Sequence, residues 1–107
     1  MKIAVTGATG FIGHYIVRQL LAAGHQLTCW CRESSDLGGF PDDPDNLQWL
    51  PGALGDPTAT EQLVTNCDAV VHAALWRPGA QFRGGEGDLV QFAETNLIGS
   101  LRLMQAA

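Results

Sequence analysis

The sequence has 107 residues, 46% hydrophobic and 16% charged, which is typical of one compact domain and excludes a disordered or fibrous chain. A formal net charge of −5 leaves no basic stripe to neutralise phosphates, so the sequence argues against nucleic acid as a partner. No apolar run approaches the roughly 20 residues that cross a bilayer, so we expect no membrane partner.

The first half of the chain alternates between strand and helix patterns. Residues 1–6 (MKIAVT) form a short apolar run rich in β-branched residues, which predicts a buried strand that stops at a glycine cluster. A helical pattern of about three to four turns follows and ends at Gly24 as its C-cap. Residues 26–32 return to strand character, and the polar residues 33–45 predict a surface loop.

The second half repeats this alternation. Residues 46–50 predict a third strand, 58–66 a short helix, and 68–74 (DAVVHAA) a nearly continuous apolar strand. Residues 76–88 are rich in glycine, and 89–107 show a long helical pattern. Strands that alternate with helices predict an α/β fold of the Rossmann type: a doubly wound parallel sheet, truncated to about four strands in the order 3-2-1-4.

Three cysteines, Cys29, Cys31 and Cys67, show neither CxxC nor Cys/His ligand spacing, and no signal peptide precedes them. We therefore expect reduced thiols in a cytoplasmic protein and no metal site.

Gly7, Gly10 and Gly13 lie where the first strand passes into the first helix. A tight turn, a close approach to a pyrophosphate and close helix packing each require a residue without a side chain. The helix then directs free N–H groups at the phosphates. The spacing is GxxGxxG rather than GxGxxG, and no lysine follows to make a P-loop. Within a complete strand-helix-strand unit it predicts dinucleotide binding; the alternative is a merely structural glycine turn.

Three segments in order carry a resemblance to a known family. Residues 6–13 (TGATGFIG) resemble the TGxxGFIG signature of extended short-chain dehydrogenases/reductases, the NAD-dependent epimerase/dehydratase family. Residues 68–74 are similar to the family's fourth strand, and 96–107 (NLIGSLRLMQAA) to its following helix. The resemblance covers essentially the whole chain and implies an NAD(P) cofactor. The signature positions that it implies for cofactor binding are Gly7, Thr9, Gly10, Phe11, Ile12 and Gly13.

The residue after the second strand separates NAD from NADP in Rossmann proteins, because a carboxylate there binds the ribose 2′-hydroxyl and an arginine accepts a 2′-phosphate. Arg32 lies at this place, and Ser34 or Ser35 can add a hydroxyl, so we predict NADP(H), with Arg32 and Ser35 at the phosphate. The alternative is that Arg32 is a solvated strand end and that Glu33 or Asp36 binds the ribose of NAD.

The turn after the third strand departs from the family. Members commonly have Gly-Asp-Leu there, with the aspartate accepting from the adenine amino group, whereas this chain has Gly52-Ala53-Leu54. Leu54 remains as an apolar contact to adenine. Asp56 either replaces the missing carboxylate or caps the next helix.

The resemblance also implies roles after the fourth strand. Ala73 and Ala74 resemble the small residues over which the cofactor lies, and Asn96 resembles the helix asparagine that holds the active-site backbone. His72 has no second ligand or carboxylate beside it and is predicted to be a satisfied core or strand-end histidine. Tyr15 lacks the lysine of the family's YxxxK pair, since position 19 is glutamine.

The family's catalytic Ser or Thr, Tyr and Lys have no counterpart here, and Lys2 is the only lysine, so no catalytic residue is assigned. We expect residues 1–107 to be the N-terminal NAD(P)-binding portion of an epimerase, dehydratase or reductase, inactive by itself, whose complete form transfers hydride to a nucleotide-sugar or small carbonyl substrate. Residues 76–88 are expected to border that substrate site. The alternative is a non-enzymatic module that senses NADP(H). The fourth strand lacks internal charge or proline, which predicts self-association through its edge unless the terminal helix covers it.

Overall fold

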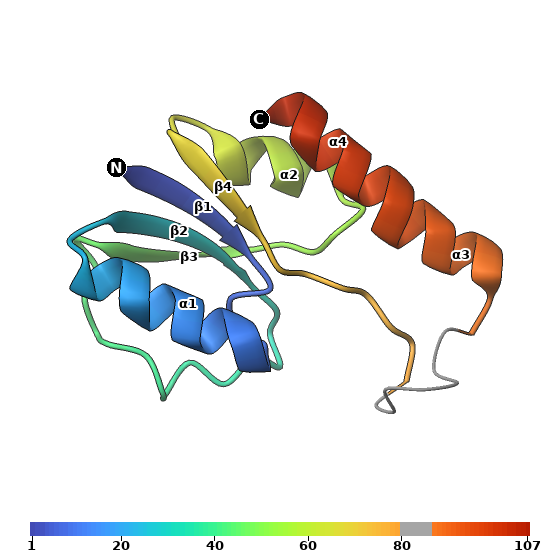
Figure 1. Ribbon diagram of the computed structural model, residues 1–107. Helices are drawn as coiled ribbons and strands as arrows, with labels where there is room; N and C mark the ends of the chain where they lie inside the picture. Colours follow the sequence, from blue (N-terminus) through green and yellow to red (C-terminus); the bar gives the residue numbers. More distant parts are fainter. Residues whose placement is uncertain (80–86) are drawn as a thin grey trace.

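The computed structural model describes residues 1–79 and 87–107. Its centre is a parallel sheet in the order β3-β2-β1-β4, which confirms the predicted fold class (Figure 1). The strands are β1 (Lys2–Thr6), β2 (Gln26–Cys31), β3 (Leu47–Pro51) and β4 (Ala69–His72). Since all four are parallel, their carboxyl ends meet at one edge of the sheet.

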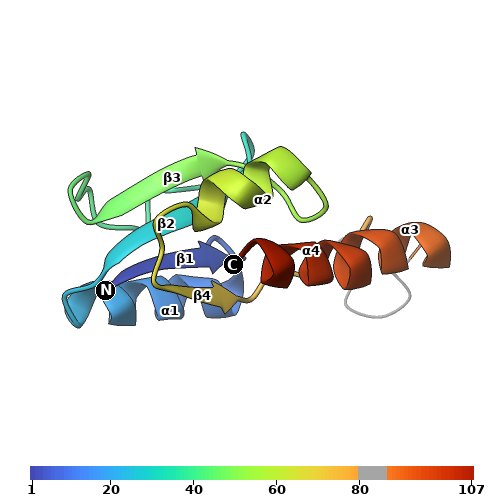
Figure 2. The same ribbon diagram turned by 90° about the horizontal axis from the view of Figure 1, so that it is seen from above.

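Helices cover both faces of this sheet (Figures 1 and 2). The helix α1 (Phe11–Ala22) lies on one face, and α2 (Pro57–Val64) and α4 (Gly99–Ala106) lie on the other. Successive side chains of a strand point to opposite faces. In β1, Ile3 therefore packs against the α1 side, whereas the neighbouring Ala4 packs against the side of α2 and α4.

The predicted helix over residues 89–107 is one helical segment with an irregular turn inside it. It begins with α3 (Leu89–Ala93), whose N-cap Asp88 accepts hydrogen bonds from the backbone N–H groups of two residues of its first turn. A π-helical turn, η1 (Glu94–Ile98), then joins α3 to α4. Such turns are rare and often lie at functional sites, and nothing in the sequence periodicity predicted this one.

Element boundaries moved by a few residues from the sequence-based expectation. Both α2 and β4 end two residues earlier than predicted, at Val64 and His72. After β4 the backbone N–H groups of Ala73 and Ala74 both donate to Thr6 Oγ1, at 3.2 Å. Gly84 and Gly85, from the glycine-rich segment predicted at 76–88, lie outside the described residues.

Asp56 caps α2, as one of its two predicted roles required. Its Oδ1 accepts a hydrogen bond from the backbone N–H of Ala59 at 3.1 Å.

In the part of the chain that the structure describes, no helix has the length and apolar character to cross a membrane.

Candidate functional site: a pocket at the carboxyl edge of the sheet

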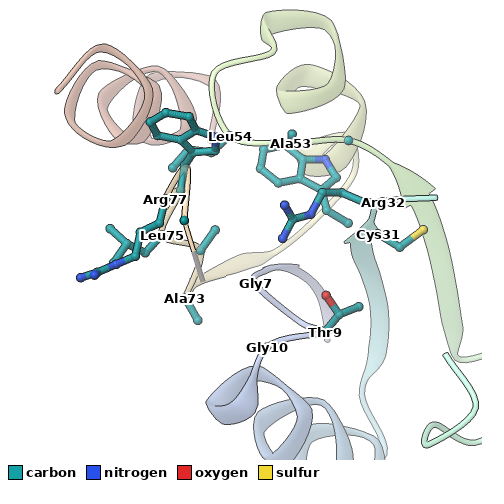
Figure 3. Close-up of a pocket in the computed structure, with 15 residues that line it drawn as sticks. Gly7, Thr9, Gly10, Cys31, Arg32, Ala53, Leu54, Ala73, Leu75 and Arg77 are labelled. Carbon is teal, nitrogen blue, oxygen red and sulfur yellow. The ribbon is translucent and has the colours of Figure 1, made fainter. Parts of the chain in front are cut away.

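A pocket of about 420 Å³ lies where the carboxyl ends of the four strands meet (Figure 3). Its wall is built from the segment that follows each strand: the glycine loop after β1, the end of β2, the turn after β3 and the exit from β4. This is the edge at which open parallel sheets bind ligands, and the volume lies in the range of small-molecule sites.

The glycine loop forms one side of the pocket through Gly7, Thr9 and Gly10. Gly7 has a φ of +69°, a left-handed conformation that favours glycine. The backbone N–H of Gly10 donates to the carbonyl oxygen of Gly7 at 3.1 Å. A β-carbon at Gly13 would lie 1.9 Å from that same oxygen, so only glycine lets α1 approach the loop so closely.

The first turn of α1 presents backbone N–H donors beside this loop. Gly10 is the N-cap of α1, and its helix has no side-chain cap there. The leading N–H groups of a helix have no intrahelical acceptor, and the helix dipole places partial positive charge at them. The arrangement is suited to an anionic group.

The end of β2 supplies a cation to the pocket wall. The Arg32 side chain turns into the space above Gly7, whereas the sulfur of Cys31 points away from it (Figure 3). The backbone N–H of Arg32 donates to Ser35 Oγ at 2.9 Å, and Arg32 O accepts from Ser35 N–H at 2.9 Å, which holds the turn after β2. No ion pair engages the Arg32 guanidinium within residues 1–79 and 87–107, so it remains available to a ligand.

The turn after β3 closes the pocket on the other side through Gly52, Ala53 and Leu54. The helix α4 packs on this turn at Gly99, where a β-carbon would lie 3.1 Å from Leu54 Cγ. The absence of a side chain at Gly99 thus lets α4 lie close against Leu54.

The exit from β4 forms the remaining wall, from Ala73 through Arg77. Asn96 fixes this segment by two hydrogen bonds to one residue: Trp76 N–H donates to Asn96 Oδ1 at 2.7 Å, and Asn96 Nδ2 donates to the Trp76 carbonyl oxygen at 2.9 Å. The side chains of Arg77 and Arg32 lie on opposite sides of the pocket (Figure 3). Arg32 and Arg77 are the charged side chains among the described residues of the wall.

The structure brings most of the predicted site residues together. In the wall are seven of them: Gly7, Thr9, Gly10, Arg32, Leu54, Ala73 and Ala74. The others lie just outside it, where they build the loop, the helix or the supporting contacts: Phe11, Ile12, Gly13, Ser35 and Asn96. The side chains of Phe11 and Ile12 are exposed, 84% and 67%, and they do not line the pocket.

Comparison with known proteins agrees with this arrangement. Residues 3–107 match the NAD dependent epimerase/dehydratase family. The chain belongs to this family.

Individual members of the family resemble the chain at moderate identity. It is 32% identical over 107 residues to the 2-alkyl-3-oxoalkanoate reductase of Stenotrophomonas maltophilia, covering 99% of this chain and 29% of that protein. It is similar to the Bordetella bronchiseptica enzyme WbmH in complex with NAD+, at a TM-score of 0.77 and 28% identity, covering 99% of this chain and 34% of that one. The Thermotoga maritima UDP-glucose 4-epimerase with UDP-glucose matches at a TM-score of 0.77 and 26% identity, covering 99% and 33%.

The chain spans only part of these relatives. Among the first curated relatives the covered share of their own length ranges from 8% to 30%.

Several wall residues of this family member were not predicted as site residues. They are Trp30, Cys31, Ala53, Trp76 and Arg77. A strand-order argument could have found them, because each lies at the carboxyl end of β2 or in the segment that follows β3 or β4.

His72 is a satisfied strand-end histidine, as predicted. Its ring contacts the Thr6 and Ser100 hydroxyls, and burial lowers its pKa below the ordinary value of 6.5.

In the described part of the chain, no three His, Cys, Asp or Glu side chains gather as metal ligands.

Proposed function

We propose that residues 1–107 form the NAD(P)-binding part of an oxidoreductase or epimerase that transfers hydride. The observation that carries the proposal is the meeting of the glycine loop, the α1 N-terminus and Arg32 at one pocket on the carboxyl edge of the sheet. Family membership supports it, since a relative of this chain was solved with NAD+.

Each part of the pocket suits one part of a dinucleotide. The pyrophosphate would lie over the loop formed by Gly7, Thr9 and Gly10, and the leading N–H groups of α1, at Phe11, Ile12 and Gly13, would donate to it. Leu54 would contact the adenine. The cofactor would then extend across Ala73 and Ala74, which offer little side-chain bulk, and Asn96 would hold the wall beside its nicotinamide end.

We propose NADP(H) rather than NAD(H) as the preferred cofactor. The guanidinium of Arg32 turns into the pocket, and a guanidinium binds a phosphate through two parallel hydrogen bonds. Ser35, bonded to the Arg32 backbone, is placed to add a hydroxyl. The competing carboxylates lie outside the pocket wall: Glu33 is exposed, and Asp36 Oδ1 accepts from the Gly38 N–H at 2.9 Å.

The substrate would be a nucleotide sugar or a small carbonyl compound. Relatives of this chain include a UDP-glucose 4-epimerase solved with UDP-glucose and a 2-alkyl-3-oxoalkanoate reductase. Both substrate classes have a carbon that gains or loses hydride, which is the chemistry that a nicotinamide supplies. Turnover by a full-length form is the property that separates this function from a non-enzymatic NADP(H) sensor.

We also propose a reducing compartment, the cytoplasm, because Cys29, Cys31 and Cys67 are free thiols in the structure.

The test is titration of NADPH and of NADH into the chain, followed by calorimetry and by the fluorescence of Trp30 and Trp76, which line the pocket. We expect saturable binding of both and at least about tenfold tighter binding of NADPH, since a hydrogen bond to a charged group contributes about 1.5–3 kcal/mol. The variant Arg32→Glu should reverse this preference.

Arg102→Glu is the matched control, because Arg102 is exposed on α4 and the substitution changes the net charge equally. It should leave the NADPH to NADH ratio unchanged. Absence of saturable binding by either dinucleotide would overturn the proposed function, whereas equal or tighter binding of NADH would overturn the NADP preference alone.

A further inference from the structure

The ring of His72, the last residue of β4, joins β1 to α4 behind the pocket. Its Nδ1 lies 2.6 Å from Thr6 Oγ1, and its Nε2 lies 2.8 Å from Ser100 Oγ. The Ser100 hydroxyl in turn donates to the backbone carbonyl oxygen of Asn96, one turn earlier in the same helical segment. His72 itself is not in the pocket wall, so any effect on a ligand passes through its partners.

The partners of Thr6 assign every hydrogen in this chain of bonds. Thr6 Oγ1 accepts from the backbone N–H groups of Ala73 and Ala74, both at 3.2 Å, which uses its two lone pairs. Its own hydrogen must therefore be donated to His72 Nδ1. A neutral imidazole that accepts at Nδ1 carries its hydrogen on Nε2, so His72 donates to Ser100 Oγ.

These bonds hold one wall of the pocket from two sides. At one end, Thr6 holds the backbone of Ala73 and Ala74, which lies so close to Gly7 that a β-carbon there would be 2.5 Å from the Ala73 carbonyl carbon. At the other end, Asn96 holds Trp76 by its two side-chain hydrogen bonds. Residues 73–76 are thereby fixed against the glycine loop.

We propose that His72 is a positioning residue of the dinucleotide site: its neutral form, with the hydrogen on Nε2, fixes residues 73–76 against Gly7, and protonation of the ring weakens cofactor binding. The inference rests on the proposed function, whose cofactor would lie across this wall. It extends that function by making affinity depend on the protonation of a residue that the cofactor does not touch.

Protonation breaks the arrangement because a histidinium ring donates from both nitrogens. A hydrogen on Nδ1 needs a lone pair of Thr6 Oγ1 and so competes with the N–H groups of Ala73 and Ala74, of which the Ala73 N–H also donates to the Thr6 carbonyl oxygen at 3.2 Å. Burial lowers the pKa of His72. Among the described residues, the ionisable groups on the flanks of β4 and on β1, η1 and α4 are Lys2, Cys67, Asp68, Arg77, Glu94 and Arg102.

The direction in which pH changes cofactor affinity follows from the lowered pKa of His72. Since the folded-state pKa of His72 lies below 6.5, the ring is neutral at pH 7.5 and the wall is intact. Affinity should be full above about pH 6.5, the ordinary histidine pKa, and should fall as the pH drops through the pKa of folded His72.

The first experiment measures NADP+ affinity of the full chain between pH 8 and 5, for the wild type and for His72→Gln, which cannot titrate. A 2′-phosphate also titrates near pH 6, so the quantity compared is the ratio of the two dissociation constants at each pH. We expect the wild type to lose at least about tenfold more affinity than His72→Gln on acidification, the size of one lost hydrogen bond with its unpaired partner. Parallel pH profiles would overturn the inference.

Hydroxyl variants supply the second arm. Thr6→Ser and Ser100→Thr keep the hydroxyl and should retain the wild-type profile, whereas Thr6→Val keeps the shape and should weaken NADP+ binding about tenfold at pH 7.5. Equal binding by Thr6→Val and Thr6→Ser would contradict the proposal.

The third readout is independent of any ligand. Long-range ¹H–¹⁵N NMR of the imidazole should show hydrogen on Nε2 of His72 in the wild type, and Thr6→Val should shift this tautomer. Hydrogen on Nδ1 in the wild type would overturn the inference. If instead the tautomer is as expected but the wild type binds no dinucleotide at any pH, the proposed function fails, and with it the role of the ring in cofactor binding.

Discussion

A β-carbon at Gly52 would lie 2.5 Å from both Cδ1 and Nε1 of the Trp30 indole. The turn after β3 therefore lies directly on the indole, which is 5% exposed and donates from Nε1 to the Ala59 carbonyl oxygen at 3.3 Å. Trp30 packs in the core below α2 and also lines the pocket. The position of the wall at Ala53 and Leu54 consequently depends on a contact inside the core.

Gly52→Ala should destabilise the fold and weaken dinucleotide binding together. The added methyl group must displace the indole or the turn, and overpacking of this kind costs about 1–3 kcal/mol in the free energy of unfolding. Trp30→Leu removes the obstacle at its own cost. In a double-mutant cycle by urea unfolding, we expect the two losses to be less than additive, with a coupling of at least about 1 kcal/mol. Strictly additive losses would show that the two residues do not restrict each other.

Gly7→Ala should cost more stability than Gly24→Ala. Both glycines have positive φ, +69° and +86°, so both substitutions introduce the strain of a left-handed residue, about 1–2 kcal/mol. Only at Gly7 would the new β-carbon also meet backbone, whereas nothing lies within 4 Å at Gly24. Urea unfolding of the two variants separates the strain from the clash, and equal losses would rule out the clash.

Cys29 should be unreactive toward thiol reagents in the folded chain. Burial first, and the neighbouring Cys31 second, raise its pKa to about 12, so at pH 8 only about one molecule in ten thousand carries the reactive thiolate. A chromogenic disulfide reagent at pH 8 should therefore leave Cys29 unmodified until urea unfolds the chain. Cys29→Ala should leave the fast phase of modification unchanged, while Cys31→Ala should reduce it; the reverse result would contradict the assignment.

The chain should self-associate through β4. Within residues 1–79 and 87–107, β4 pairs only with β1 and has no strand on its other side. An edge without charge or proline is a template for pairing with a second copy. Light scattering at high micromolar concentration should detect a dimer or larger species, and Ala69→Lys, which places a charge on the edge strand, should reduce it. A monodisperse wild-type monomer would exclude pairing of this kind.

Most of the fold could be predicted because its signals are local. The run of Ile3, Ala4 and Val5 before a glycine is a buried parallel strand in almost any context, and the alternation of such runs with helical patterns restricts the sheet order to few possibilities. Boundaries were less predictable: β4 ends at His72, and the next backbone N–H, that of Ala73, donates to Thr6 Oγ1, a residue far away in the sequence.

The site could be predicted in part for the same reason. Gly7, Gly10 and Arg32 each belong to a short sequence pattern that predicts cofactor binding, and all three lie in the pocket wall. The contact of Gly52 with Trp30 and the two partners of His72 could not be predicted, since each joins segments that only the folded sheet brings together. Taken one at a time, these residues are predicted to be core residues. Only their contacts in the folded chain show that they hold the wall of the pocket.

The π-turn at Glu94–Ile98 limits which changes in length the chain can accept. Removing one residue there would let the segment close as an ordinary α-helix, but it would turn α4 by about 100° and shift it by about 1.5 Å relative to α3. Asn96 could then face Trp76 only if Ser100 and the buried Leu103 turned away from the sheet. The loop over residues 33–45 also contacts the fold, since the Phe40 ring lies 4.8 Å from that of Trp49 and Arg18 Nη2 donates to the Gly39 carbonyl oxygen at 2.7 Å. The π-turn differs from this loop because it sets the rotation of α4, so insertions and deletions should be excluded from the π-turn.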